Sequence, residues 1–405
     1  MIREFTIENF KSIENLTLPL GRVTVLIGEN GAGKSNVLEG MAFLAATAQS
    51  KLNAEFLHSR GVRAAPGPLP LSAFKGTKTG WRRHSFYAGA TAHGTKANCA
   101  FIICGENTDE GTNHDWAASA GKPREDQTEV IGLSLTHEEL KKILEVASKL
   151  EGKKISLKKQ PDLHFLQAVG QSQLAYANEL RRAAKLFPTP FVIYSPENTA
   201  LRTFEAEGQM RPLGVRGEGL FKLVQHFAEH QPAKFKLLRK ELKLFDWFED
   251  FAIPKRLGIG ESRLEIKDRF LAAKRLLDQR SANEGFLFLL FYLCLFLSPQ
   301  TPKFFAIDNI DASLNPKLCA EMMRRLVALA KQEDKQVIIT THNPAILDGL
   351  DLTDKEQLLY AVQRDSKGRT SAQRIAAPKP QRGESALKLS HAYLRGLLGG
   401  VPKNF

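Results

Sequence analysis

The feature that most constrains this chain is the run Gly28-Glu29-Asn30-Gly31-Ala32-Gly33-Lys34-Ser35. It follows an apolar stretch at 22–27 that is typical of a buried strand. It precedes residues 34–45, in which Val37, Leu38, Met41 and Leu44 have helical spacing. A glycine-rich turn between a strand and a helix lets backbone N–H groups point at phosphate oxygens, and the helix N-terminus adds a partial positive charge. Lys34 would supply a cation for the terminal phosphates and Ser35 a hydroxyl for magnesium, so the run predicts a P-loop that binds ATP and Mg²⁺.

Two later segments fit the same site. Four apolar residues at 304–307 precede Asp308, which is typical of a buried strand that delivers a carboxylate to a magnesium ion opposite a P-loop. The strand predicted at 336–340 is followed by Thr341-His342-Asn343-Pro344. A histidine at the carboxyl end of a strand faces the ligand crevice of a parallel sheet, so we interpret His342 as a sensor of the γ-phosphate.

The remaining pattern predicts an α/β fold with a largely parallel sheet flanked by helices. The run at 286–297 is apolar all round, which indicates a fully buried helix that begins near Asn283; it is too short to span a bilayer. Further strands are predicted at 2–7, 16–20 and 191–194, further helices at 219–230, 234–251 and 316–332, and a C-terminal hairpin at 358–363 and 370–375.

Residues 47–188 lack the parallel-sheet pattern, and we expect them to form an inserted, mainly helical lobe. Its predicted helices are 136–150, which opens with a capping box, and 163–186, whereas 105–122 is polar and is predicted to be a loop. The expected domains are therefore a discontinuous head at 1–46 and 189–380, the inserted lobe, and a tail at 381–405 with a short helix.

The net charge and the cysteine content indicate which binding partners and which cellular compartment to expect. The formal net charge of +13 suits a phosphate-bearing partner such as nucleic acid, and the lysines at 149–159 would contribute; a solvated basic surface is the alternative. The four cysteines form no C-x-x-C pair, which argues against a zinc site or a disulfide framework. Together with an N-terminus that does not resemble a signal peptide, this predicts a cytoplasmic protein without a membrane partner.

These motifs together resemble the ABC-type ATPases of the RecF, SMC and OLD kind. Glu8-Asn9-Phe10-Lys11-Ser12 before the P-loop is similar to the opening of that family, and 308–316 is similar to its Walker B motif and D-loop. Tyr194-Ser195-Pro196-Glu197 is similar to the Q-loop region of RecF. The resemblance implies catalytic roles for Asp308, Asn309, Asp311 and His342, and magnesium binding by Ser35 and Asp308. It implies nucleotide binding by Lys11, Ser12, Asn30, Gly31, Ala32, Gly33, Lys34, Ser35 and Asn36.

In that family two heads close around ATP, and a signature loop of one head contacts the γ-phosphate held by the other. The usual Ser-Gly-Gly sequence is absent here, and the best candidate is Ser281-Ala282-Asn283-Glu284-Gly285 at the start of the buried helix. The segment that would act on the other chain is thus Ser281, Asn283, Glu284 and Gly285. A helix cap formed by Ser281 or Asn283 is the simpler explanation of the same residues.

One residue departs from the family pattern. The family normally has a glutamate after the Walker B aspartate, where it polarises the attacking water, and this chain has Asn309. An amide can orient water but cannot accept its proton, so we expect ATP binding with slow hydrolysis. Asp311 is an acidic residue that could substitute.

The sequence thus predicts an ATP-dependent switch that forms a homo-oligomer and controls a separate effector, such as a nuclease or toxin. By family analogy alone, stand-alone ATPases of this kind often belong to bacterial anti-phage defence. Two alternatives remain open: a RecF-like ATPase that binds DNA itself in repair, and a nucleotide-gated scaffold without turnover.

Overall fold

The computed structural model describes residues 1–49, 51, 54–63, 85–92, 94–108, 111–120, 177–178, 180–204, 211–254, 256–258, 261–272, 275–311, 314–377 and 388–398. A six-stranded sheet with the order β13-β12-β3-β11-β10-β7 lies at its centre. The strands from β12 to β7 are parallel to their neighbours, and β13 is antiparallel to β12. They span β3 (Val23–Ile27), β7 (Ile193–Tyr194), β10 (Phe304–Ile307), β11 (Gln336–Thr341), β12 (Gln357–Arg364) and β13 (Thr370–Ile375).

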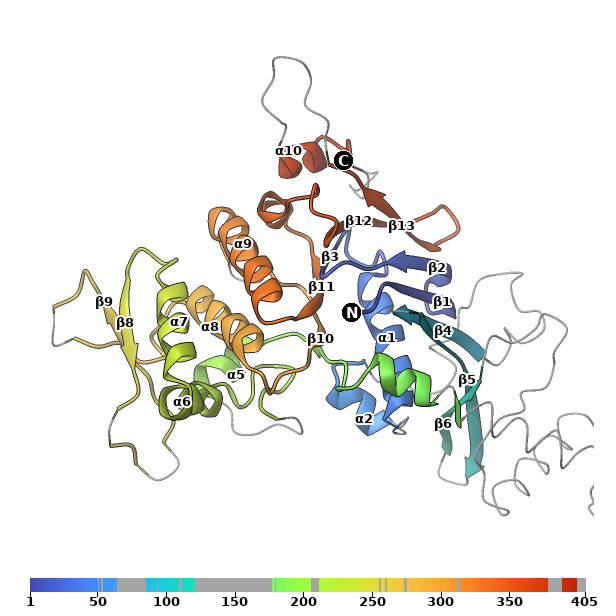
Figure 1. The fold of residues 1–405 in the computed structure, drawn as a ribbon, viewed down its shortest axis with the longest axis horizontal. Coiled ribbons are helices and arrows are strands. Elements are labelled where there is room, and N and C mark those ends of the chain that lie inside the picture. The colour runs from blue at the N-terminus through green and yellow to red at the C-terminus, as the bar shows by residue number, and fades with distance from the viewer. Residues whose placement is uncertain are drawn as a thin grey trace, which may run out of the picture.

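The central strands are apolar on both faces because both faces are covered. In β11, Val337 and Ile339 face one core cluster and Ile338 faces the other. The first face packs against α8 (Glu284–Leu297), whose side chains are buried from Gly285 to Leu297. A helix that is apolar all round needs neighbours on every side, which places it in the middle of this layer (Figure 1). The predicted buried helix and the predicted parallel sheet are both confirmed.

The other face of the central sheet carries α1 (Lys34–Ala48) and a second, five-stranded antiparallel sheet with the order β2-β1-β4-β5-β6. Helix α1 contacts strands of both sheets, so it lies between them (Figure 1). The second sheet comprises β1 (Glu4–Phe10), β2 (Ile13–Pro19), β4 (Ser85–Ala92), β5 (Thr95–Thr108) and β6 (Gly111–Ala120).

Three of these strands come from the region expected to be an inserted lobe. Strand β4 pairs with β1, so the chain continues the N-terminal sheet instead of leaving it at residue 47. The prediction of a loop at 105–122 is wrong, because β5 and β6 form a long antiparallel pair there. The described part of this region also contains α2 (Ala54–Ser59) and a helical stretch at 180–186, the end of the helix predicted at 163–186. The helix predicted at 136–150 and the lysines at 149–159 lie outside the described residues.

Further helices cover the α8 side of the central sheet: α5 (Asn198–Thr203), α6 (Leu220–His230), α7 (Pro232–Leu242) and α9 (Pro316–Gln332). The helix predicted at 234–251 is too long, because the chain turns after α7 and forms β8 (Phe248–Ala252), which pairs with β9 (Glu265–Asp268). Phe248 and Trp247 pack against Phe286 of α8, with ring centroids 5.3 and 5.5 Å apart. This aromatic contact buries residues whose spacing also fits a helix.

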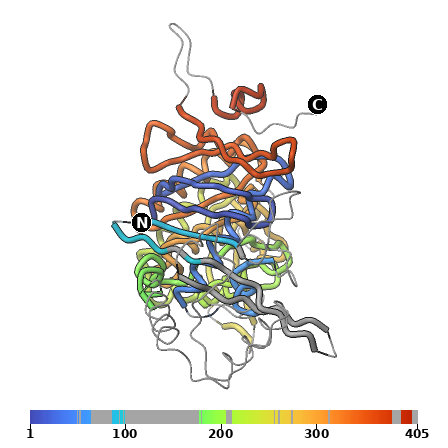
Figure 2. The backbone as a smooth tube through the Cα atoms, turned by 90° about the vertical axis from the view of Figure 1, so that its right-hand side faces the viewer, coloured from blue at the N-terminus to red at the C-terminus, as the bar shows by residue number. Residues whose placement is uncertain are grey.

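The C-terminal hairpin β12–β13 lies beside the N-terminal strands, as Figure 2 shows where its orange-red tube runs next to the blue one. The backbone N–H of Thr370 donates to the carbonyl of Ser12 at 2.7 Å, and Tyr360 donates to the carbonyl of Pro19 at 2.7 Å. After β11 the chain forms the 3-10 helix η2 (Pro344–Gly349), against which the short helix α10 (Leu389–Leu394) docks. In the part of the chain that the structure describes, no helix has the length and apolarity needed to cross a membrane.

Candidate nucleotide site

The glycine-rich loop connects β3 to α1 at the carboxyl edge of the parallel strands. Gly31 and Gly33 have φ of 76° and 104°, which side chains other than glycine rarely adopt. A Cβ atom on Gly28 would lie 2.0 Å from the carbonyl oxygen of Val362, and one on Gly33 would lie 2.1 Å from Oγ1 of Thr370. The loop therefore needs glycine at these positions for two reasons, its backbone shape and the close approach of the C-terminal hairpin.

Lys34 is buried at the start of α1, and its ammonium group folds back over the loop. Nζ donates to the carbonyls of Gly28 and Glu29 at 2.9 Å each, and it lies 3.3 Å from Nδ1 of His342. Burial lowers the pKa of Lys34 to about 8, although Asp308, Asp311 and Glu29 attract the proton. The site thus holds a cation that an incoming phosphate group would stabilise.

His342 lies directly across from this loop. Its Nδ1 is 2.9 Å from the carbonyl oxygen of Gly28, so the imidazole donates there when Nδ1 carries the proton. Burial, followed by the nearby Lys34 cation, lowers the pKa of His342 below its usual value. The predicted sensor histidine is thereby placed beside the lysine that would bind the terminal phosphates.

Ser35 and Asp308 meet as a hydroxyl–carboxylate pair. Oγ of Ser35 donates to Oδ2 of Asp308 at 2.9 Å, and the hydroxyl of Thr340 donates to the other carboxylate oxygen. Hard oxygen atoms of these two types are the ligands that magnesium prefers beside a P-loop. The structure therefore brings together the two residues predicted to hold the metal.

The residues after Asp308 differ in their surroundings. Asn309 is exposed and has a left-handed backbone with φ of 55°, and its N–H donates to Oγ1 of Thr340 at 2.9 Å. Oδ1 of Asp311 instead accepts from the hydroxyl of Thr341 at 2.5 Å and from the N–H of His342 at 3.4 Å. Asp311 thus ties the segment after β10 to the segment that carries His342.

The opening motif reaches the loop from β1 and its turn. Lys11 forms an ion pair with Glu39 of α1, which also accepts from Nε of Arg63 at 2.6 Å. Nδ2 of Asn36 donates to Oγ of Ser12 at 2.7 Å. Ser12 is thus tied to the residue that follows the loop in α1, whereas Lys11 is tied to α1 through Glu39.

Sequence reasoning missed four residues of this neighbourhood. Oγ1 of Thr370 donates to the carbonyl of Ala32 at 2.8 Å and shares a hydrogen bond of 2.7 Å with Oγ of Ser12. Thr340 bonds to Asp308, Glu39 pairs with Lys11, and Arg63 pairs with Glu39. The sequence does not reveal that a single polar residue in a strand or helix contacts the site, because its hydrogen-bond partner is far away in the chain.

The candidate signature segment lies elsewhere. It precedes α8, whereas the P-loop precedes α1, and the two helices pack on opposite faces of the central sheet. Asn283 is the N-cap residue of α8, but its side chain makes no capping hydrogen bond, and the N–H of Ser281 donates to Oδ1 of Asp278 at 2.9 Å. Neither Ser281 nor Asn283 therefore acts as the side-chain cap that we considered as the simpler explanation.

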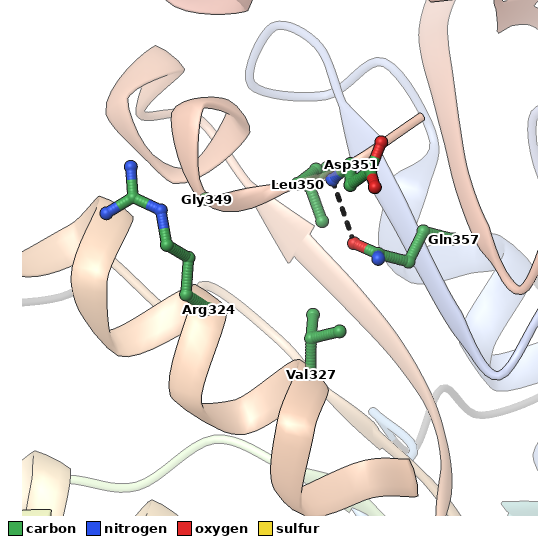
Figure 3. A pocket seen from close by; sticks show the side chains of 6 residues that line it. All are labelled: Arg324, Val327, Gly349, Leu350, Asp351 and Gln357. Atoms are coloured by element: carbon green, nitrogen blue, oxygen red, sulfur yellow. Dashed lines mark hydrogen bonds between the residues drawn. The ribbon is translucent and has the colours of Figure 1, made fainter. Parts of the chain in front are cut away.

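A pocket of about 240 Å³ between α9, η2 and the start of β12 is a separate feature (Figure 3). Arg324, Asp351 and Gln357 line it, and the side chain of Gln357 accepts from the N–H of Asp351 at 3.0 Å. Because it adjoins the beginning of β12, it lies at the opposite edge of the sheet from the P-loop and is not part of the nucleotide site.

Comparison with protein families agrees with this geometry. A family model described as an AAA ATPase domain matches residues 1–165, and one described as an AAA domain, putative AbiEii toxin, Type IV TA system, matches residues 227–348. The chain is a P-loop ATPase. The two matches contain the P-loop, Asp308 and His342 of this ATPase, and the predicted family and fold class are confirmed.

Solved structures similar to the ATPase include SMC head domains. The SMC head domain from Thermotoga maritima is 13% identical, with 92% of this chain and 98% of that chain covered and a TM-score of 0.40. An Smc head with an extended coiled coil, bound to the C-terminal domain of ScpA derived from Pyrococcus furiosus, is 12% identical, with coverages of 93% and 96% and a TM-score of 0.44. Comparison with curated protein sequences gives no match.

Proposed function

We propose that this ATPase is a slow, ATP-gated switch. ATP would bind with its phosphates on the loop N–H groups and Lys34, and Ser35 and Asp308 would hold Mg²⁺, which neutralises charge on the β- and γ-phosphates. The oxygen donors of Ser35 and Asp308 already lie 2.9 Å apart, so the pair fits such an ion. His342 would contact the γ-phosphate from the next strand.

The observation that carries the proposal of slow turnover is Asn309. It is exposed at the end of β10, one residue after the predicted metal ligand, where the family has its water-polarising glutamate. Phosphoryl transfer depends mostly on positioning and electrostatics, so an amide that orients water supports some hydrolysis. Asp311 is engaged with Thr341 and the backbone of His342, which favours a positioning role for it over a role as the missing base.

The second part of the proposal is that two chains close around ATP. The helices that begin at the P-loop and at the signature segment lie on opposite faces of one sheet. A signature segment so placed would meet a nucleotide held by a second chain. In this dimer, the N-terminal end of α8, where Asn283 is exposed and Gly285 is buried, would approach the γ-phosphate, since backbone N–H groups at a helix start bind anions.

The third part is that the ATP-bound dimer controls a separate effector in anti-phage defence, such as a nuclease or toxin. The family model that matches residues 227–348 is described as an AAA domain, putative AbiEii toxin, Type IV TA system, and this description supports a place in a TA system. The net charge of +13 favours a second candidate function, a DNA-binding ATPase of the RecF kind. A neighbouring nuclease or toxin gene would favour defence, and a replication neighbourhood would favour repair.

The slow-switch proposal is tested by Asn309→Glu. A carboxylate at this position should raise kcat by about 10–100-fold, at or below the low end of what a general base usually contributes, because phosphoryl transfer needs little base strength. It should also change the nucleotide that remains on the protein after rapid desalting from mostly ATP to mostly ADP. Asn309→Gln is the matched control, because it keeps the amide and should not accelerate hydrolysis. Slower turnover in Asn309→Glu than in the wild type would show that the base lies elsewhere.

A further inference from the structure

The side chain of Arg202 donates hydrogen bonds to the backbone of the candidate signature segment. Nη1 donates to the carbonyl of Arg280 at 2.6 Å and to the carbonyl of Ala282 at 2.9 Å. The two acceptors flank Ser281, so a single guanidinium nitrogen, which carries two N–H groups, fixes the backbone on both sides of that residue. Hydrogen bonds from a charged donor are stronger than those between neutral groups.

The segment that Arg202 contacts exposes its two polar residues. Ser281 and Asn283 are exposed, whereas Ala282 between them is 2% exposed. The N–H of Ser281 donates to Oδ1 of Asp278. Hydrogen bonds to Arg202 and to Asp278 thus hold the backbone of the loop, while Ser281 and Asn283 are exposed.

A series of contacts also connects the nucleotide site to the helix that carries Arg202. The N–H of Asp308 donates to the carbonyl of Tyr194 at 2.8 Å, and Tyr194 precedes the segment that leads into α5, the helix that carries Arg202. Rings of Tyr194 and Phe291 of α8 pack edge to face with centroids 5.8 Å apart. The strand beside Asp308 therefore contacts the middle of α8, and α5 contacts the segment before α8 through Arg202.

We propose that Arg202 is a positioning residue that holds the Ser281 segment in the conformation required by the nucleotide of a second chain. The inference rests on the proposed ATP-dependent dimer. Loss of the guanidinium should release the loop without disturbing the P-loop of the same chain. Nucleotide affinity and association are therefore expected to respond differently.

The test compares full-length Arg202→Ala, Arg202→Lys and the wild type. A fluorescent ATP analogue should bind all three with the same affinity to within about twofold, since Lys34 and Ser35 are untouched. The protein concentration at half-maximal ATP-dependent association, measured by light scattering, should rise about tenfold in Arg202→Ala, and kcat at saturating ATP should fall similarly. Arg202→Lys keeps a cation that can reach one carbonyl and should be intermediate.

Two controls separate the possible outcomes. Arg3→Ala removes an exposed arginine that adjoins the opposite edge of the sheet, where Ile2 bonds to Gln336 at the start of β11, and should behave as the wild type. Asn283→Arg places a bulky side chain on the exposed part of the signature segment itself. If Asn283→Arg abolishes association and turnover while Arg202→Ala matches the wild type, the role of Arg202 is refuted and the dimer stands. If ATP drives no association and Asn283→Arg keeps normal turnover, the proposed dimer fails, and the role of Arg202 fails with it.

Discussion

At the residue scale, ATP binding at this site depends on one buried ammonium group, that of Lys34. Lys34 donates to two loop carbonyls, and these neutral acceptors do not offset the cost of burying its charge, so its pKa is lowered to about 8. Phosphate groups bound in the loop would stabilise the charged form and raise that pKa again. Binding of ATP is consequently coupled to the protonation of Lys34.

This coupling predicts how ATP affinity depends on pH. Below about pH 8 Lys34 is already charged, and affinity should be constant. Above pH 8 the free protein loses the proton that the complex retains, so affinity should fall, by up to about tenfold per pH unit. Titration with a fluorescent ATP analogue between pH 7.5 and 9.5 would measure the slope.

Two variants of Lys34 check the origin of this pH dependence. Lys34→Arg keeps a permanent cation and should lose the slope, even if its affinity is lower throughout. Lys34→Ala should bind ATP very weakly at every pH, with its fold retained. A Lys34→Arg protein with the same slope as the wild type would assign the titration to another group.

Much of the site could be predicted because its residues lie just after the ends of predicted strands in the sequence. Ser35, Asp308 and His342 each lie just after a buried strand or its loop, and parallel strands bring their carboxyl ends to one edge. Thr370 could not be predicted, because its partner Ala32 is 338 residues away and the hairpin that carries it shows no ligand-binding pattern. The hydrogen bond between Asp311 and Thr341 could not be predicted either, because these residues are also far apart in the sequence.

At the element scale, segments with a clear apolar periodicity were predictable, and segments without one were not. The predicted bounds of the helix at 316–332 agree with α9, because Asn315 caps it with a side-chain bond of 3.0 Å to the N–H of Leu318 and Pro316 occupies its first position. Strands β8, β5 and β6 were missed. The apolar spacing at 245–251 fits either period, and the sequence of β6 lacks the regular alternation of apolar and polar residues that indicates a strand.

The hairpin β12–β13 supports the P-loop, and this contact yields a prediction. Thr370→Val keeps the side-chain shape but removes the hydroxyl that bonds to Ala32 and Ser12. Leaving a buried carbonyl without its donor costs about 1 kcal/mol, so ATP affinity should fall about fivefold. Thr370→Ser retains the hydroxyl and should bind ATP nearly as the wild type, in the same fluorescence titration. Equal affinities for Thr370→Val and the wild type would show that the hairpin does not shape the loop.

At the scale of the whole molecule, the central sheet separates two functions. One face carries α1 and the antiparallel sheet around the P-loop, and the other carries α8 with the signature segment and Arg202. The nucleotide-binding part and the proposed γ-phosphate contact of one chain therefore begin on opposite sides. Completion of the site by a second chain is the central claim of this account.

The most direct measurement is a mixture of two inactive variants, Lys34→Ala and Asn283→Arg, the second of which changes an exposed residue of the signature segment. In a two-chain dimer, the intact P-loop of the Asn283→Arg chain faces the intact signature segment of the Lys34→Ala chain, so one site of each mixed pair is restored. If the chains exchange freely and the sites act independently, an equimolar mixture should recover about a quarter of wild-type ATP turnover, although each variant alone has almost none. A mixture as inactive as its components would contradict the claim that the site is completed in trans.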